Sequence, residues 1–305
     1  MTAAPEISVI VANYNAKGPL EACLASLHRH DSHRTVEVLV VDDGSRDGSA
    51  AMVRDRFPEV RLLVNEENQG YARSCNRAIA ASRGRLIHLL NNDVELTPGA
   101  LDALADFLDA EPQAGAAGSL LLNSDGTVQI SAKALPTFRS ALFGGRSWFS
   151  RWLPGNRFSR LELQHWRADA GVPFTTGYVS GASMMVPRGV LRAIGDLDER
   201  LFYFNDADFC RRIWNVRRSV FCVPAARSVH LNHQGGSRRT LRRRLWALAA
   251  FHRGAYVYAR KHYAPGAWSV GHACVALGLA GRFLVTGALQ LCKEIAGVER
   301  RAYGK

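Results

Sequence analysis

The fold class is most clearly indicated by the segment Val36-Glu37-Val38-Leu39-Val40-Val41-Asp42-Asp43-Gly44-Ser45. It is a short apolar run rich in β-branched residues that ends in two carboxylates and a glycine. This pattern is typical of a buried strand followed by a turn. A second run of the same kind, Ile7-Ser8-Val9-Ile10-Val11-Ala12, comes before it and ends in Asn13-Tyr14-Asn15. We therefore expect two strands with polar residues at their carboxyl ends.

Two further apolar runs, 60–64 and 86–90, follow, and segments with helical spacing separate the four runs. In the clearest helix the spacing i, i+3, i+4, i+7 is filled by Leu101, Leu104, Ala105 and Leu108. Thr97 is the expected N-cap of this helix and Pro98 lies in its expected first turn. This alternation predicts an α/β fold in which a parallel sheet is covered on both faces.

Polar residues follow each of the four runs. They are Asn13-Tyr14-Asn15, Asp42-Asp43-Gly44-Ser45, 65–70 and Asn91-Asn92-Asp93. In open parallel sheets ligands bind at the carboxyl ends of the strands. We therefore expect the four clusters to converge on one crevice.

The regular pattern weakens over 121–175, where paired glycines and several tryptophans indicate a long excursion that is functional or disordered. It returns with an expected strand from Val179 to Val186. Helices are expected from Arg188 to Ile194 and from Asp206 to Trp214.

The six cysteines are far apart and form no C-x-x-C pair, so the sequence does not support a zinc finger or an iron–sulfur site. Scattered thiols in a chain of this size are usually small buried apolar residues.

The net charge of +12 is unevenly divided. Residues 1–120 hold 11 basic and 17 acidic side chains, whereas 121–305 hold 28 basic and 10 acidic ones, and 209–305 alone hold 18 basic and 2 acidic ones. Anionic lipid, nucleic acid or acidic glycan would each complement such a basic region.

The C-terminal region after Ser237 predicts a basic amphipathic helix. One stripe is apolar, with Leu241, Leu245, Leu248 and Ala255, and another is basic, with Arg242, Arg253 and Arg260. No nucleic-acid motif is present, so an anionic membrane surface is favoured over nucleic acid as the partner. Segment 267–292 is mostly apolar, but Arg282 near its middle disfavours a membrane span.

Asp42 and Asp43 follow a strand, where a carboxylate can accept hydrogen bonds from a nucleobase or a ribose hydroxyl. Alternatively, both acids are merely solvated and Asp47 caps the next helix. Asp93, just past another strand, is a hard oxygen ligand suited to Mg²⁺ or Mn²⁺ held together with a diphosphate. The alternative is an Asx-rich turn.

Asp206, in Asn205-Asp206-Ala207-Asp208, can serve as a general base while Asp208 braces Arg211 or Arg212. Alternatively, both acids favour a helix N-terminus through the macrodipole. His230 and His233 form a metal or phosphate site, or are ordinary structural imidazoles.

The order of these pieces resembles glycosyltransferase family 2 over roughly 6–240. The resemblance is carried by the four clusters above, by Asn68-x-Gly70-x-x-Arg73-x-x-Asn76, and by Ser180-Gly181-Ala182-Ser183, Gly195-x-Leu197-Asp198-Glu199, Asn205-Asp206-x-Asp208 and His230. Within the family it is most similar to bacterial rhamnosyltransferase-type members that extend cell-surface polysaccharides.

The resemblance implies a GT-A fold, a Rossmann-like, mostly parallel sheet with helices on both faces, here with a C-terminal amphipathic helical extension. It implies a nucleotide-sugar-binding half over 1–120, an acceptor-binding and catalytic half over 121–237, and a basic extension over 238–305 that associates with membrane.

The resemblance also assigns roles to residues. Asp206 would be the catalytic base, and Asp93 and His230 would hold Mg²⁺ or Mn²⁺. The nucleotide sugar would be bound by Ala12, Tyr14, Asp42, Asp43, Arg73, Asn92 and Asp93.

Two positions depart from the family pattern. Asn91 replaces the first acid of the Asp-x-Asp motif, which removes one charge from the metal site. Asn205 replaces the acid of the common Glu-Asp-x-Asp pattern and changes the electrostatic neighbour of Asp206.

The implied function is inverting transfer of a sugar, rhamnose among the candidates, from a dTDP- or UDP-linked donor to a hydroxyl of a glycan or lipid-linked glycan in cell-surface polysaccharide synthesis. The implied location is cytoplasmic, peripheral at the inner face of the cell membrane. The alternative is an inactive relative that binds glycan or another anionic polymer.

Overall fold

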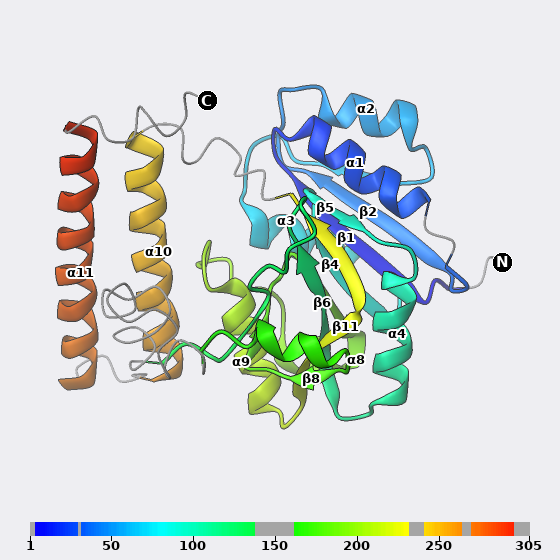
Figure 1. The fold of residues 1–305 in the computed structure, drawn as a ribbon. Coiled ribbons are helices and arrows are strands. Elements are labelled where there is room, and N and C mark those ends of the chain that lie inside the picture. The colour runs from blue at the N-terminus through cyan, green and yellow to red at the C-terminus, as the bar shows by residue number, and fades with distance from the viewer. Residues whose placement is uncertain (1–3, 30–31, 138–161, 232–240, 264–269, 296–305) are drawn as a thin grey trace. The chain divides into compact units, whose positions relative to one another are not determined.

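The computed structural model describes residues 4–29, 32–137, 162–231, 241–263 and 270–295 (Figure 1). The chain divides into two compact units. The first consists of Met1–Asp198 and Asn205–His233, and the second of Glu199–Phe204 and Gln234–Lys305. Each unit is described by itself.

The four expected strands are confirmed as β1 (Ile7–Asn13), β2 (Val36–Asp42), β3 (Arg61–Val64) and β4 (Leu86–Asn91). They lie side by side in the order β3-β2-β1-β4, and all three pairings are parallel. Consecutive parallel strands joined by helices place all four carboxyl ends at one edge of the sheet.

The second half of the unit completes a nine-stranded sheet of order β3-β2-β1-β4-β10-β6-β11-β5, with β8 paired to β11. Its strands are β5 (Val94–Leu96), β6 (Ala114–Leu122), β8 (Phe174–Thr175), β10 (Ser183–Pro187) and β11 (Ser219–His230). Strand β10 is antiparallel to both β4 and β6, and β6 is parallel to β11, so six strands share one direction. A mixed but mostly parallel sheet results, as the sequence predicts.

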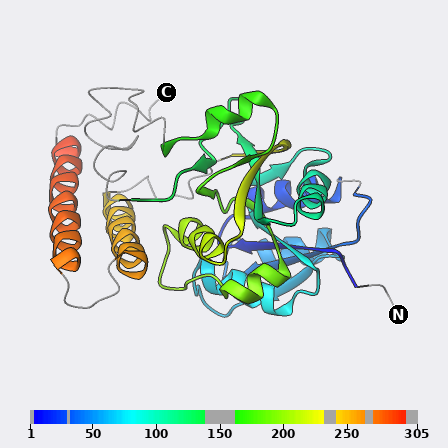
Figure 2. The ribbon, with the colours of Figure 1, turned by 90° about the horizontal axis from the view of Figure 1, so that it is seen from below.

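Helices cover both faces of this sheet (Figure 1 and Figure 2). One apolar cluster joins the sheet to α1 (Lys17–His28), α2 (Ser49–Arg56) and α4 (Ala100–Ala110). The other joins it to α3 (Tyr71–Ala81), α8 (Arg188–Ile194) and α9 (Asn205–Asn215). The expected helices 188–194 and 206–214 are thus confirmed.

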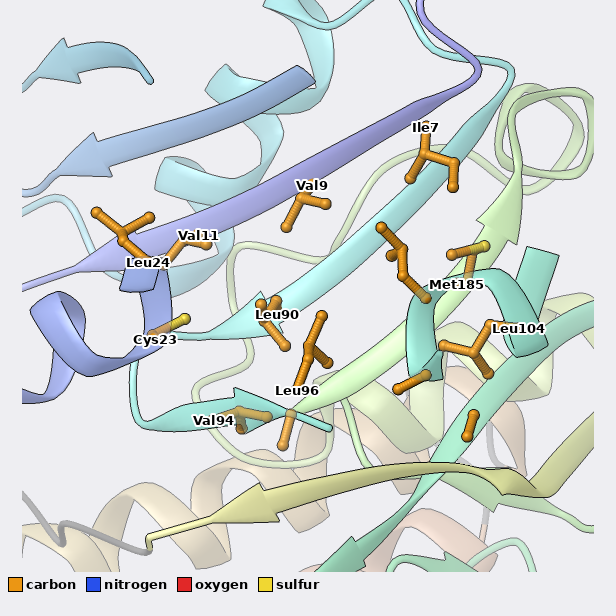
Figure 3. Packing of buried hydrophobic residues seen from close by; sticks show 14 of the residues in the cluster. Ile7, Val9, Val11, Cys23, Leu24, Leu90, Val94, Leu96, Leu104 and Met185 are labelled. Atoms are coloured by element: carbon orange, nitrogen blue, oxygen red, sulfur yellow. The ribbon is translucent and has the colours of Figure 1, made fainter. Parts of the chain in front are cut away.

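Figure 3 shows why β1 is so apolar. Ile7, Val9 and Val11 point from one side of the strand into the first cluster, where Leu24 of α1 and Leu104 of α4 also lie. Alternate residues of the same strand fill the other cluster, as Ile10 does. A strand buried on both faces therefore needs a continuous apolar run.

The four cysteines in the fully described parts of the first unit are confirmed as free, buried thiols: Cys23, Cys75, Cys210 and Cys222. Burial raises the pKa of Cys75, Cys210 and Cys222 to about 12. They behave as small apolar residues in the core.

Two local expectations are wrong. The single strand expected from Val179 to Val186 is two strands, because β9 (Tyr178–Val179) pairs with β7 (Ala132–Lys133) in a separate small sheet before the chain turns into β10. The fourth helix begins at Ala100 with Gly99 as N-cap. Thr97 does not cap it, since its hydroxyl donates to the carbonyl of Arg227 at 2.9 Å.

The region 121–175, expected to be an irregular excursion, contains regular structure in its described parts. Strands β7 and β8 and a 3-10 helix, η1 (His165–Ala170), lie there. Residues 138–161, with most of the aromatics that the sequence emphasises, lie outside the described residues.

The second unit contains α10 (Leu241–His262) and α11 (Val270–Ile295), which run side by side (Figure 2). The predicted amphipathic pattern is confirmed for α10, where Leu241, Leu245 and Leu248 are partly covered and Arg242, Arg253 and Arg260 are exposed. Among the described residues, no helix combines the length and apolarity needed to cross a membrane.

Candidate active site

The carboxyl edge of the parallel strands is tied together by side-chain amides. Asn13, at the end of β1, donates from Nδ2 to Oδ1 of Asp42 at 3.1 Å. Its Oδ1 accepts from Nδ2 of Asn92 at 2.8 Å. Three of the four expected clusters therefore lie together, because one buried asparagine joins the ends of β1, β2 and β4.

Asp43 organises the loop after β3. Its Oδ1 accepts from Nδ2 of Asn65 at 2.6 Å and from the backbone N–H of Gln69 at 2.9 Å. Its Oδ2 accepts from the N–H of Gly70 at 2.8 Å. Both carboxylate oxygens thus serve to hold the chain immediately before α3, so any ligand contact of Asp43 adds to a structural role.

Asp47 supports two helices, although the N-cap of α2 is Gly48 and the preceding acids, Asp42 and Asp43, are buried rather than merely solvated. Its Oδ1 accepts from the N–H of Ser49 at 3.0 Å, and its Oδ2 accepts from the N–H of Lys17 at 2.8 Å. Burial acts to raise the pKa of Asp47, but the hydrogen bonds from Ser49 and Lys17 outweigh it and lower the pKa. One carboxylate therefore satisfies the first turns of both α1 and α2.

Asp93 and His230 lie next to each other just beyond the carboxyl end of β4. Strand β11 pairs antiparallel with β5, His230 stands opposite Val94, and the N–H of Leu231 donates to the carbonyl of Asp93 at 3.0 Å. The side chains are consequently close, with Nε2 of His230 3.3 Å from Oδ1 of Asp93. Residues far apart in the sequence are thus brought together by strand pairing.

The donor set of this pair fits a divalent ion. Two neighbouring ligands of an octahedral ion, each about 2.1 Å from the metal at a right angle, stand about 3.0 Å apart. The separation of 3.3 Å is close to that value. No cluster of three or more His, Cys, Asp or Glu able to hold a metal ion occurs in the part of the chain that the structure describes. The remaining ligands would have to come from a substrate, as for magnesium ions bound together with phosphates.

Asp206 lies in the first turn of α9, at the same edge of the sheet. The N–H of Asn91 donates to the carbonyl of Ala182 at 2.9 Å, which fixes the segment before β10 at the end of β4. A Cβ built on Gly181 would lie 3.6 Å from Cβ of Asp206. Gly181 and Asp206 are therefore direct neighbours, and a backbone hydrogen bond from Gly181 also acts on the Asp206 carboxylate to lower its pKa, against the larger effect of burial.

The surroundings of Asp206 tune its proton affinity. Burial raises the pKa of Asp206 above its ordinary value, while the ammonium of Lys133 and the backbone N–H of Ala207, at 2.8 Å from Oδ1, oppose the shift. Asp208 has a different environment. It is fully buried and its Oδ2 accepts from Nε of Arg212 at 2.9 Å, which confirms the expected brace. Of these two acids, Asp206 is therefore the one suited to exchange a proton at this edge.

The other expected nucleotide-site residues take different positions. Ala12 pairs in register with both Val41 and Asn91, so it lies between β2 and β4. Tyr14 is 50% exposed just beyond β1. Arg73 is exposed in the first turn of α3, whereas His233 lies outside the described residues.

Sequence reasoning missed three residues around the site. Tyr71 and Lys133 interact electrostatically with Asp206, and burial raises the pKa of Tyr71, with smaller contributions from Cys75 and Asp206. Gln129 contacts His230 through Nδ1 at 3.0 Å. No local pattern marks these residues, because tertiary pairing alone brings 129 and 133 to the edge.

Residues 8–195, more than half of the chain, match the profile described as Glycosyl transferase family 2. The chain belongs to glycosyltransferase family 2. A relative in Mycobacterium tuberculosis, an N-acetylglucosaminyl-diphospho-decaprenol L-rhamnosyltransferase, is 32% identical over 269 residues, which cover 83% of each chain.

Solved structures similar to this family-2 glycosyltransferase support its fold. A mannosyltransferase from Pyrobaculum calidifontis, in complex with GDP-Man and Mn²⁺, has a TM-score of 0.57 and 17% identity, covering 100% of this chain and 77% of that one. S. aureus TarS 1–349 has a TM-score of 0.52 and 15% identity, covering 91% and 80%. The expected GT-A fold is confirmed.

Proposed function

We propose that this glycosyltransferase moves a sugar from a nucleoside-diphosphate donor to a hydroxyl of a lipid-linked glycan, with inversion at the anomeric carbon. The observation that carries the proposal is the shared sheet edge, where a half-buried carboxylate with a raised pKa, Asp206, accompanies the Asp93–His230 pair. Asp206 would supply a proton acceptor, and the Asp93–His230 pair would bind a diphosphate together with its counter-ion.

Asp206 is the proposed base. A hydroxyl becomes a competent nucleophile only as its proton leaves, and a positioned base contributes about 10²–10⁴-fold to such a step. The raised pKa brings the carboxyl closer to working pH, which makes its anion a better acceptor of that proton. A single displacement at the anomeric carbon, with no enzyme nucleophile, inverts the configuration.

The nucleotide part of the donor is proposed to lie along the ends of β1 and β2. The exposed ring of Tyr14 offers a stacking surface for the base. Asp42 and Asp43, with Ala12, would contact base or ribose, and Arg73 and Asn92 would lie toward the sugar diphosphate. Under this proposal residues 1–120 bind the donor and 121–237 bind the acceptor.

Asp93 and His230 are proposed to hold Mg²⁺ or Mn²⁺. When bound, such an ion neutralises negative charge on the leaving diphosphate as a Lewis acid. Two protein ligands suit this task, since the ion then keeps coordination positions for phosphate oxygens. Asn91 contributes no charge there, so the exposed Arg73 would share the neutralisation.

The proposed donor is a dTDP- or UDP-linked sugar, with rhamnose as the first candidate. The support is the relative in Mycobacterium tuberculosis, whose name gives an L-rhamnosyl transfer to a decaprenol-linked acceptor. A lipid-linked acceptor would place the reaction at a membrane, and we propose the cytoplasmic face.

Association with an anionic membrane surface is proposed for the second unit. In its helix α11 the exposed positions between 273 and 289 whose burial is described are all Ala, Gly, Leu or Val. The most exposed are Leu277 at 74% and Leu284 at 68%. Exposed apolar residues next to the arginines of α10 are the combination that an in-plane helix presents to headgroups and acyl chains.

The test uses the purified full chain with a panel of nucleotide sugars, a lipid-linked glycan acceptor, and Mg²⁺ or Mn²⁺. We expect release of nucleoside diphosphate with one donor and a product of inverted anomeric configuration by NMR. Asp93→Ala should remove the gain in nucleoside diphosphate affinity that metal provides. Tight binding of glycan without turnover for any donor would favour the alternative, an inactive binding module.

A further inference from the structure

Gln129 is held in place by three hydrogen bonds within the first unit. Its backbone N–H donates to the carbonyl of Leu121 at 2.8 Å. Its side-chain Nε2 donates to the carbonyl of His230 at 2.6 Å and to Oδ1 of Asn123 at 2.8 Å. The turn just before it is equally well braced, because the N–H of Asn123 donates to the carbonyl of Thr127 at 2.8 Å. The amide of Gln129 therefore sits on a rigid support.

These contacts fix which way the amide points. A backbone carbonyl can only accept a hydrogen bond, so the group that faces the carbonyl of His230 must be the NH₂. The amide oxygen, Oε1, then faces Nδ1 of the His230 ring at 3.0 Å. Because Oε1 has no proton to give, Nδ1 must carry one and donate it.

The proton on Nδ1 decides the state of the other ring nitrogen. In a neutral imidazole with Nδ1–H, the lone pair resides on Nε2. That nitrogen lies 3.3 Å from Oδ1 of Asp93, which is also an acceptor. In the neutral ring two acceptors thus face each other at this distance, an arrangement that a cation between them would stabilise. The ring is thus oriented, in its neutral state, as a metal ligand.

We propose that Gln129 is a positioning residue that locks His230 in the Nδ1–H tautomer with Nε2 directed at the metal. The inference rests on the proposed metal centre at Asp93 and His230. It adds to that centre a contact of the kind in which a ligating histidine donates its other N–H to a neighbouring oxygen.

Three variants separate the parts of this contact. Gln129→Leu removes the acceptor for Nδ1–H and both donors. Gln129→Glu keeps an oxygen for Nδ1–H but loses the donor to the His230 carbonyl. Gln113→Leu is the matched control, since Gln113 is exposed at the opposite end of β6. Circular dichroism and thermal melting verify that each variant is folded.

The first measurement is long-range ¹H–¹⁵N NMR of the metal-free, ¹⁵N-histidine-labelled full chain at about pH 8.5, above the range in which histidine ordinarily titrates. His230→Gln assigns the ring signals. We expect Nδ1 to be protonated in the wild type, in Gln129→Glu and in the control. In Gln129→Leu the proton should move wholly or partly to Nε2.

The second measurement is calorimetric titration of Mn²⁺ into protein saturated with nucleoside diphosphate. Loss of such a supporting contact typically weakens metal binding about 10- to 100-fold, and we expect this range for Gln129→Leu and a change within a few fold for Gln129→Glu.

The outcomes distinguish the two proposals. A wild type that shows no metal-dependent binding would refute the metal centre, and the NMR signals of the metal-free protein would still decide the role of Gln129. A wild type that binds Mn²⁺, together with a folded Gln129→Leu of unchanged tautomer and affinity, would overturn the inference alone. An Nε2–H tautomer in the wild type would overturn it as well.

Discussion

Asp206 carries two opposing demands at the scale of a single side chain. As a base it must be ionised, yet its half-buried position favours the neutral form and raises its pKa. A group held in this compromise is typical of functional sites. The opposition leads to two separate expectations for one substitution, one on activity and one on stability.

Asp206→Asn should lower transfer by about 10²–10⁴-fold, the usual contribution of a positioned base. Nucleoside diphosphate affinity should stay within a few fold, because the amide keeps the size and an acceptor for the N–H of Ala207. Steady-state transfer and calorimetric binding measure the two quantities. Near-normal turnover in this variant would contradict the assignment of the base.

The same variant should be more stable than the wild type at pH 7.5. Because the folded pKa of Asp206 is raised, the unfolded chain ionises it at lower pH than the folded chain does. The wild type therefore loses stability as pH rises from the ordinary pKa, about 3.9, through the raised one.

Thermal melting from pH 7.5 down to about pH 4 measures this difference, which should shrink as both states of the wild type become protonated. Asp55→Asn, exposed in α2, is the control and should show no such trend. A variant less stable than the wild type at every pH would show that the ionised carboxylate is structurally favourable.

Among the elements, two helices depend on one carboxylate, because Asp47 accepts hydrogen bonds from the first turns of both α1 and α2. Asp47→Ala removes an acceptor from the first turn of α1 and another from that of α2. Each such loss costs about 0.5–2 kcal/mol, so we expect the free energy of unfolding in urea at pH 7 to fall by about 1–4 kcal/mol. Asp55→Ala, at an exposed position of α2, is the control and should change the free energy of unfolding by only about 0.5 kcal/mol.

The pH dependence of this cost has a definite sign. The pKa of Asp47 is lowered by its hydrogen bonds despite burial, so the stabilisation is present above the ordinary pKa and is lost as pH falls through the lowered one. The difference between Asp47→Ala and the wild type should therefore shrink toward about pH 3. A cost that stays constant down to that pH would show that the carboxylate charge contributes nothing.

Elements could be predicted from the sequence where their own residues form a recognisable hydrophobic or polar pattern. Strands β1, β2 and β4 have continuous apolar runs because neighbouring elements cover both of their faces, whereas β3 at the sheet edge is only partly covered. Helix α9 begins with two acids. The first half of strand β6, by contrast, has the sequence Ala-Gly-Ala-Ala-Gly. Small residues are needed there because neighbouring side chains lie close: a Cβ at Gly118 would be 2.5 Å from a side-chain atom of Val179. Packing against a residue far away in the sequence produces no periodic hydrophobic pattern, so it could not be predicted.

The same limit applies to the site. Asp93 stands out in the sequence because it follows a strand, and Asp206 because it lies at the start of a helix. Gln129 and Lys133 do not, since their place depends on the path of the chain after β6. Residue patterns report what a strand or helix buries along its own length, and the contacts between distant segments appear only in the fold.

At the scale of the whole molecule, the charge division predicts a salt-sensitive membrane interaction. Replacing Arg238, Arg239, Arg242, Arg243 and Arg244 by Gln should lower the affinity for anionic vesicles about tenfold or more, since each basic residue contributes up to about 1 kcal/mol to binding. Vesicle sedimentation measures the loss. The first two arginines lie outside the described residues.

The controls separate charge from insertion. Replacing five exposed arginines of the first unit, Arg29, Arg54, Arg61, Arg83 and Arg192, should leave vesicle binding nearly unchanged. Raising salt from 0.1 M to 1 M shortens the Debye length from about 10 Å to about 3 Å and should mimic the loss. Binding that survives both treatments but fails in Leu277→Ser with Leu284→Ser would assign the contact to α11, and binding only to nucleic acid would refute the membrane partner.

The place of β11 in the sheet has a consequence for how the protein is made. Strands β1 to β4 leave the ribosome first, but β11 begins only at Ser219, and it is β11 that covers β6 and carries His230 to Asp93. A nascent chain that stops before Ser219 would present β6 as a bare apolar edge, open to pairing with other chains. Premature termination would therefore yield an aggregation-prone fragment rather than a smaller working enzyme.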